Sequence, residues 1–138
     1  MTEQPRFIEV AASTENLLAV RNFVARHARL HGFGEKDTEE IRLSVDEAMT
    51  NVIKHAYGYD DSKLIYVSVG SDERTFWVAI QDNGHAFDIS SYTTPDVPQR
   101  IKNRQKGGVG VYLIKKLMDK VEYSSKGQHN EIRMIKNL

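Results

Sequence analysis

Three short blocks of this sequence carry residue types that suit nucleotide chemistry. The first runs from Glu47 to Ala56, the second from Asp82 to Asp88 and the third from Gly107 to Gly110. Together they supply an acid, an amide and two glycine-rich turns, which can hold a nucleotide and its metal ion. One block alone would be weak evidence for a nucleotide site, whereas all three blocks in this order within 138 residues form a specific pattern.

The first block contains an acid, an amide and an imidazole at a helical spacing. Glu47, Asn51 and His55 follow one another every four residues, which places them on one flank of a predicted helix. The Asn51 oxygen is a suitable neutral ligand for Mg²⁺, and Glu47 could accept a proton from an attacking hydroxyl. The alternative for the pair is a solvated polar flank. For His55, an ordinary helix-end histidine bonded to backbone or a neighbour is the simpler interpretation.

The second block follows a predicted strand. Asp82 there could accept a hydrogen bond from an exocyclic amine, which favours adenine over guanine because guanine has a carbonyl at that position. Gly84 would let the base approach the backbone. The alternative is a plain turn, since Asp-Asn-Gly is a common turn sequence.

The third block opens a predicted helix, where free N–H groups and the helix dipole suit a phosphate. It is neither a Walker loop nor a Rossmann fingerprint, because both the spacing and the flanking residues differ. Lys102, Arg104 and Lys106 lie just before it and could touch phosphate, or they could form a solvated basic run.

Hydrophobic periodicity and turn residues predict the elements that must position these blocks. The first helix should be capped by Ser13 or Thr14 and end near Gly32 and Gly34, with a core stripe of Leu17, Val20, Phe23, Val24 and Leu30. Residues 82–106 have no clean period, and we expect a mobile lid at about 89–106. The remaining expected elements are a strand Arg6–Ala11, a helix Asp37–Tyr57, a hairpin of Lys63–Gly70 and Thr75–Gln81, a helix Val109–Lys120, and a hairpin of Val121–Ser125 and Glu131–Lys136.

This order of elements predicts a single α+β domain spanning residues 1–138. We expect a two-layer α/β sandwich, with a mixed five-stranded sheet covered on one face by three helices. Composition excludes several classes of protein. The zero net charge argues against non-specific binding to nucleic acid or a membrane surface, and the absence of cysteine excludes disulfides and thiolate zinc sites. A cytoplasmic protein is expected, because the absence of cysteine fits that compartment. No apolar stretch approaches the ~20 residues of a membrane span, and Met1–Arg6 has no leader pattern.

In the three blocks described above, the chain resembles the ATPase superfamily of gyrase, histidine kinases and mismatch-repair proteins. Glu47, Asn51 and His55 match its N box, Asp82–Asp88 its first glycine box and Gly107–Gly110 its second. Within the superfamily the chain is most similar to the small anti-sigma-factor serine/threonine kinases, over nearly its full length. His85-Ala86 and Gln128-His129-Asn130 depart from the usual pattern.

The resemblance implies a role for each matching residue. Glu47 would be the catalytic base, Asn51 the Mg²⁺ ligand and Asp82 the adenine anchor, in a histidine-kinase-like ATPase fold. The glycines of both boxes would shape the pocket and its lid. The implied ATP contacts are Asn51, His55, Asp82, Gly84, Phe87, Lys106, Gly107, Gly108, Val109 and Gly110.

The resemblance also implies an activity and partners. The protein would be a Mg-ATP-dependent serine/threonine kinase that sequesters a sigma factor and phosphorylates an anti-anti-sigma protein, with a homodimer expected. The alternative is a nucleotide-binding switch module that regulates a partner without significant kinase activity. Arg21, in a row of Leu18, Ala25 and Ala28 on the first helix, is the candidate partner contact. The alternative there is a solvated arginine.

Overall fold

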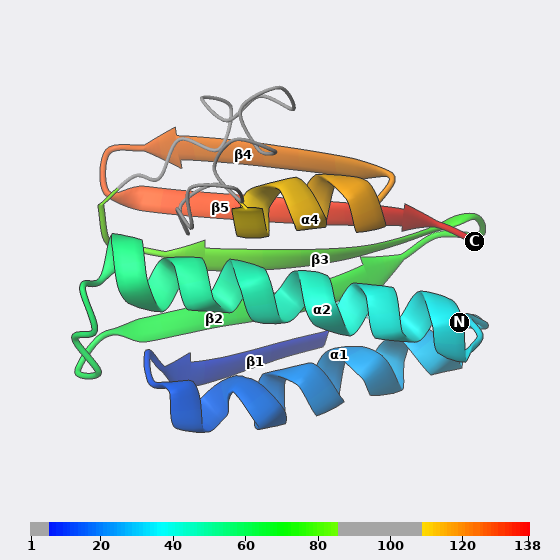
Figure 1. Cartoon of the computed structure of the whole chain (residues 1–138), viewed down its shortest axis with the longest axis horizontal. Coiled ribbons are helices and arrows are strands. Elements are labelled where there is room, and N and C mark those ends of the chain that lie inside the picture. The colour runs from blue at the N-terminus through cyan, green and yellow to red at the C-terminus, as the bar shows by residue number, and fades with distance from the viewer. Residues whose placement is uncertain (1–5, 86–108) are drawn as a thin grey trace.

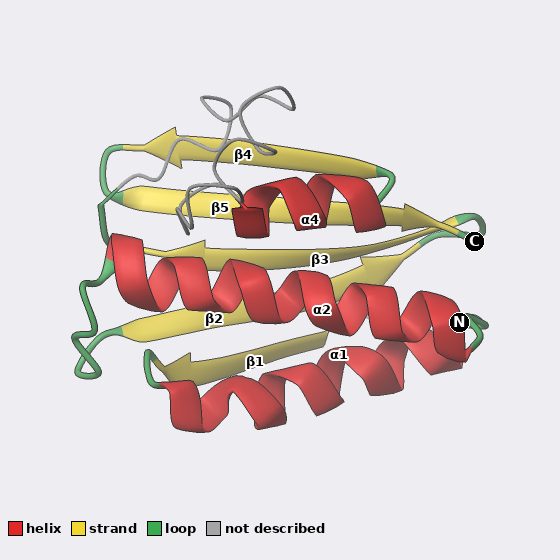
Figure 2. Cartoon of the chain, viewed as in Figure 1, coloured by secondary structure: helices red, strands yellow, loops and turns green. Residues whose placement is uncertain are grey.

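The described part of the chain forms two layers, with a sheet on one side and helices on the other (Figure 1, Figure 2). The structure is a computed structural model, and it describes residues 6–85 and 109–138. The strands are β1 Arg6–Ala11, β2 Leu64–Ser71, β3 Thr75–Asp82, β4 Lys120–Lys126 and β5 His129–Asn137. The helices are α1 Leu17–His31, α2 Glu35–Asn51 and α4 Val109–Leu117, with a 3-10 turn at Thr14–Asn16 and a π-helical segment at Val52–Ala56. The predicted α+β class is confirmed.

The sheet has the order β1-β2-β3-β5-β4, and every pair of neighbouring strands is antiparallel. The prediction of a mixed sheet is therefore wrong. Strands β3 and β4 do run in the same direction, as expected for two strands connected through a helix. They are not neighbours, however, because β5 turns back after β4 and lies between them (Figure 1).

Helix α1 follows most of its predicted pattern. The Ser13 side chain accepts a hydrogen bond from the Glu15 N–H and so caps the 3-10 turn that leads into α1, and Gly32 ends the helix in the left-handed region at φ 110°. The prediction that Leu30 belongs to the core stripe is wrong, since this side chain is 72% exposed. Leu30 lies two positions after the buried Ala28, which turns it about 200° around the helix axis.

Helix α2 is the central helix of its layer, between α1 and α4 (Figure 1). The sequence predicts one continuous helix to Tyr57, but regular α-helical bonding ends at Asn51 and a wider turn follows. In that turn the Tyr57 N–H donates to the carbonyl of Val52, five residues earlier, at 3.0 Å. The wide turn changes the direction in which the last residues of the helix point.

One contiguous core lies between the layers and includes both sheet and helix residues. Lys136 enters this core from β5 and is only 7% exposed. Its Nζ donates to the carbonyl of Leu117 at the end of α4, 2.7 Å away, and lies 3.7 Å from Glu40 on α2. Lys136 thus connects α4 with α2. No helix within the described ranges is long and apolar enough to cross a membrane.

Candidate functional site

The described parts of the predicted site meet at one end of the sheet. The last residues of α2, the end of β3 and the turn between β4 and β5 lie at this end, on the left in Figure 1, and α4 begins nearer the middle of the view with its first residues directed toward it. Regions of sequence that lie far apart are therefore brought together.

Glu47 and Asn51 lie one turn apart on α2, and both are half-buried. Partial burial, together with the neighbouring charge of Asp46, raises the pKa of the Glu47 carboxyl above its usual value. A carboxylate with a raised pKa is a better proton acceptor than an ordinary surface glutamate. The predicted helical spacing of the pair is thus confirmed, while the roles of base and metal ligand stay predictions.

Arg21 of α1 contacts the residue next to Glu47. Its Nη2 lies 2.7 Å from Oδ2 of Asp46, and its Nε donates to Oδ1 at 3.1 Å, so the contact is bidentate. Ala25 and Ala28, predicted to share a surface row with Arg21, are buried at 1% and 0% exposure. Leu18 in the same row is 57% exposed, so the row is only partly at the surface, and Arg21 has an intramolecular ion-pair partner.

Asp82 is the last residue of β3, and it is almost fully buried at 4% exposure. Its Oδ1 accepts hydrogen bonds from the Gly84 N–H and from Nδ2 of Asn130, each at 2.9 Å. Asn130 also donates to the carbonyl of Gly84 at 2.9 Å. The carboxylate and the turn after it are thus held by β5.

The end of α2 holds the other side of this turn. The His85 N–H donates to the Ala56 carbonyl at 2.9 Å, and the Tyr57 hydroxyl accepts from the Asn83 N–H at 2.8 Å. A Cβ at position 84 would lie 2.2 Å from the Ala56 carbonyl oxygen. The structure therefore requires glycine at position 84 because of a backbone approach within the chain, in addition to any approach by a ligand.

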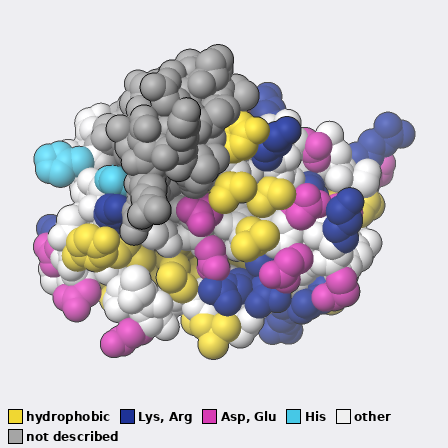
Figure 3. Space-filling view, in the orientation of Figure 1, with side chains coloured by type: hydrophobic (Ala, Val, Ile, Leu, Met, Phe, Trp, Pro, Cys, Tyr) yellow, Lys and Arg dark blue, Asp and Glu magenta, His cyan; other side chains and the backbone are white. Residues whose placement is uncertain are grey.

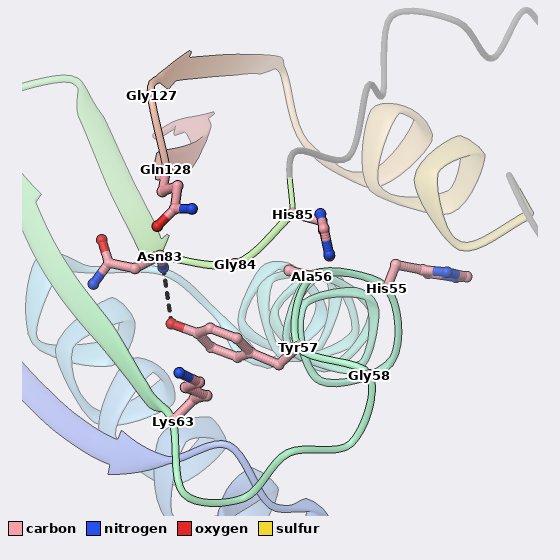
Figure 4. Close-up of a pocket in the computed structure, with 10 residues that line it drawn as sticks. All are labelled: His55, Ala56, Tyr57, Gly58, Lys63, Asn83, Gly84, His85, Gly127 and Gln128. Carbon is pink, nitrogen blue, oxygen red and sulfur yellow. Dashed lines mark hydrogen bonds between the residues drawn. The ribbon is translucent and has the colours of Figure 1, made fainter.

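A cavity of about 530 Å³ opens around this backbone contact. Figure 4 shows Ala56 and Gly84 at its centre, with His55 and His85 on one side and Lys63, Asn83 and Gln128 on the other. His55 and Gly84 belong to both the predicted nucleotide set and the lining of this cavity, whereas Glu47, Asn51 and Asp82 are not among its lining residues.

His55 lies in the π-helical segment, so it does not continue the regular spacing of Glu47 and Asn51. Partial burial and the nearby Lys54 lower the pKa of its imidazole. His55 is therefore mostly neutral at neutral pH and can accept as well as donate a hydrogen bond.

The rest of the predicted set divides into two groups. Phe87, Lys106, Gly107, Gly108 and the expected lid lie outside the described residues. Val109 and Gly110 are the first two residues of α4. Within the described ranges, no group of three or more His, Cys, Asp or Glu side chains is arranged to hold a metal ion.

Sequence reasoning missed two residues that shape the site, Asn130 and Tyr57. The sequence predicts a final strand that starts at Glu131, so Asn130 falls just before it. A signal was available, since Asn130, Ile132 and Met134 alternate on one face of a strand, and a polar residue in a buried alternation requires partners. Tyr57 carried no comparable signal.

Charged side chains of both signs are mixed over the helix face, without a large area of one sign (Figure 3). This agrees with the equal counts of 19 basic and 19 acidic residues. The visible surface therefore gives no support to a general polyanion-binding face.

Comparison with known proteins gives a consistent picture. The model of the histidine kinase-like ATPase domain family matches residues 10–136. A protein named Serine-protein kinase RsbW from Halalkalibacterium halodurans is 35% identical over 125 residues, covering 86% of this chain and 76% of that protein. A protein of the same name from Bacillus cereus is 29% identical over 119 residues, and the match covers 83% of this chain and 74% of that protein.

Among solved structures, the RsbU and RsbW domains of a Mycobacterium tuberculosis protein share this fold, with a TM-score of 0.69 and 14% sequence identity. That match covers 97% of this chain and 32% of the other chain. This chain thus corresponds to about a third of that protein.

Proposed function

We propose that this chain, which belongs to the histidine kinase-like ATPase family and has RsbW serine-protein kinases among its relatives, is an ATP-dependent protein serine/threonine kinase. One observation carries the proposal. The end of α2 is joined to the turn after β3 through the Ala56–His85 hydrogen bond. The helix with the acid–amide pair is thereby fixed against the strand that ends in the buried carboxylate Asp82.

The described residues suit distinct tasks in this reaction. Asp82 would accept a hydrogen bond from the adenine amino group, since an ionised carboxylate is an acceptor only. Asn51 would offer its side-chain oxygen to Mg²⁺, whose other ligands would be phosphate oxygens and water. These oxygen ligands suit a magnesium nucleotide, because the buried carboxylate of Asp82 and the half-buried amide of Asn51 lie on β3 and α2, which are fixed against each other.

Glu47 would act on the protein substrate. Bound ATP supplies a γ-phosphoryl group, and transfer forms a bond from the serine oxygen to the γ-phosphorus while the bond to the bridging oxygen breaks and ADP leaves. Glu47 would take the proton of the serine hydroxyl, and its raised pKa supports that role. Phe87, Lys106, Gly107 and Gly108 complete the proposal as nucleotide contacts, together with Val109, Gly110 and His55.

The proposed partners follow from the relatives. The protein would act in the cytoplasm as a homodimer, sequester a sigma factor, and phosphorylate an anti-anti-sigma protein. Arg21 is proposed as a partner contact, although its pairing with Asp46 gives it a competing role inside the chain.

Calorimetry with Mg-ATP and Mg-GTP, followed by phosphoryl transfer to anti-anti-sigma proteins of the same genome, tests the function. We expect one ATP site per chain and at least a tenfold weaker site in Asp82→Asn, because an amide presents a poorer acceptor to the adenine amine. Asp72→Asn is the matched control, since Asp72 accepts two backbone N–H groups in the hairpin turn at the other end of β3.

The outcomes separate the hypotheses. ATP binding with phosphoryl transfer supports the kinase. Binding without transfer to any such protein favours the nucleotide-dependent switch module. A folded protein that binds no adenine nucleotide overturns both.

A further inference from the structure

Asn130 is a fully buried polar side chain of β5 that contacts the predicted site residue Asp82, with an exposure of 0%. It lies on β5 directly opposite Asp82 of β3, and Ser125 of β4 lies opposite it on the other side. The three residues form a row across three adjacent strands, on the face that the helices cover. Such a row depends on strand register, and each member can contact the next.

Hydrogen bonds fix the orientation of the Asn130 amide. Its Nδ2 faces two groups that can only accept, Oδ1 of Asp82 and the Gly84 carbonyl oxygen, both at 2.9 Å. Its Oδ1 accepts from the Ser125 hydroxyl at 2.6 Å. A flipped amide would direct its oxygen at two acceptors, so chemistry allows one orientation only.

These contacts make the two oxygens of the Asp82 carboxylate differ in their hydrogen bonding. Oδ1 accepts from both Asn130 and the Gly84 N–H. Within residues 6–85 and 109–138, no hydrogen bond reaches Oδ2. Two donors on one oxygen hold the plane of the carboxylate, which leaves the second oxygen to meet a ligand in a fixed direction.

We propose that Asn130 is a positioning residue that presets Asp82 Oδ2 as the acceptor for the 6-amino group of adenine, and thereby sets adenine-over-guanine selectivity. This inference rests on the proposed function and adds a residue to it. Asn130 acts through Asp82 and need not touch the nucleotide.

The residue type matters because two donors are needed at once. A serine or threonine hydroxyl carries one hydrogen and could satisfy either Asp82 or the Gly84 carbonyl, but not both. An aliphatic side chain would satisfy neither and would free the carboxylate to rotate. Selectivity should therefore follow the number of donors at position 130.

The test measures the dissociation constants of ATP and GTP for the full chain with Asn, Thr or Leu at position 130. Asn130→Leu should weaken ATP binding by at least about tenfold while changing GTP binding less than about threefold, as expected for loss of an oriented charged hydrogen bond. Asn130→Thr keeps one hydrogen-bond donor and a residue type that suits a strand. Its ATP affinity should lie between those of the unsubstituted protein and Asn130→Leu. Temperatures are chosen at which circular dichroism shows each variant to be folded.

Ile132→Val is the matched control, because Ile132 is a buried residue on the same strand and face. It should lower thermal stability without changing the ratio of the ATP and GTP dissociation constants. If the unsubstituted protein binds ATP but both Asn130 variants keep its selectivity, Asn130 is merely structural and this inference is wrong. If the unsubstituted protein binds no adenine nucleotide, the proposed function fails first and this inference falls with it.

Discussion

Asp46 and Glu47 are adjacent carboxylates in different surroundings. Asp46 is held by two contacts from Arg21, whereas no ion pair to Glu47 is found in the part of the chain that the structure describes. Glu47 therefore keeps its oxygens available while its pKa is raised by partial burial and by Asp46. This difference assigns a structural role to one acid and leaves the other suited to proton transfer.

Replacing Glu47 by glutamine should separate activity from stability. Because the pKa of Glu47 is raised in the folded chain, its ionised form is less favourable there than in the unfolded chain. Glu47→Gln should therefore increase Tm at pH 7, and this advantage should vanish below about pH 4, where the carboxyl is protonated in both states. Phosphoryl transfer should fall by about 10²–10⁴.

Calorimetry at both pH values and a transfer assay measure these effects, with Glu39→Gln on the exposed side of α2 as control. An unchanged transfer rate in Glu47→Gln would show that Glu47 is not the base.

The Arg21–Asp46 pair should tune Glu47. Removing the cation in Arg21→Met leaves the Asp46 charge uncompensated, so the pKa of Glu47 should rise further and the acid limb of the activity profile should move to higher pH. Asp46→Asn should move that limb to lower pH. The profile of kcat/KM against pH measures both shifts.

A partner pull-down with the same variants tests the other role of Arg21. Loss of partner binding in Arg21→Met, with the pH profile unmoved, would assign Arg21 to an interface instead of the tuning of Glu47.

At the scale of elements, the wide turn at the end of α2 connects the two halves of the site. Carbonyls at a helix C-terminus lack partners within the helix, and the Ala56 carbonyl finds one in the His85 N–H after β3. Tyr57 adds a second connection through the Asn83 N–H. A displacement of α2 would therefore displace the turn that follows Asp82.

Gly84→Ala should damage this connection. Its new Cβ would meet a backbone oxygen at 2.2 Å, so α2 and the turn must separate. Overpacking of this kind costs about 1–3 kcal/mol of the free energy of unfolding, and ATP affinity should fall as well.

Gly34→Ala is the control for this substitution, since nothing lies within 4 Å of the added Cβ and the backbone there is at φ −76°. Urea unfolding and ATP titration report the two effects. Equal unfolding free energies for the two variants would contradict the role of the close approach.

At the scale of the whole molecule, the described residues share one core, and we expect one cooperative unfolding transition. Trp77 is the only tryptophan of the chain and lies on β3, covered by the Arg133 guanidinium 4.6 Å from its ring centroid. Its fluorescence and far-ultraviolet circular dichroism should give coincident urea transitions. Transitions that differ between the two probes would contradict a single cooperative unit.

Bound nucleotide should stabilise the molecule by mass action. Mg-ATP at a hundred times its Kd should add about 2.7 kcal/mol to the free energy of unfolding. Removing Mg²⁺ with a chelator should abolish most of this gain if Asn51 binds the metal. A gain that is the same with and without Mg²⁺ would exclude that role for Asn51.

Much of this molecule could be predicted from local sequence. Alternating apolar residues placed β2 and β3 to within one or two residues, and Gly32 marked the end of α1. The spacing of Glu47 and Asn51, together with the glycine blocks, indicated the family. These features depend on side-chain period and on residues a few positions apart, which a sequence displays directly.

Only the tertiary structure decided how distant segments meet. Four features were not predicted from the sequence. They are the position of β5 between β3 and β4, the π-helical end of α2, the ion pair of Arg21 with Asp46, and the hydrogen bond from Asn130 to Asp82. Each depends on contacts between residues far apart in the chain or on a helix distortion coupled to such contacts. Local periodicity determines which face of an element is buried, but register and packing between elements decide which polar atoms become partners.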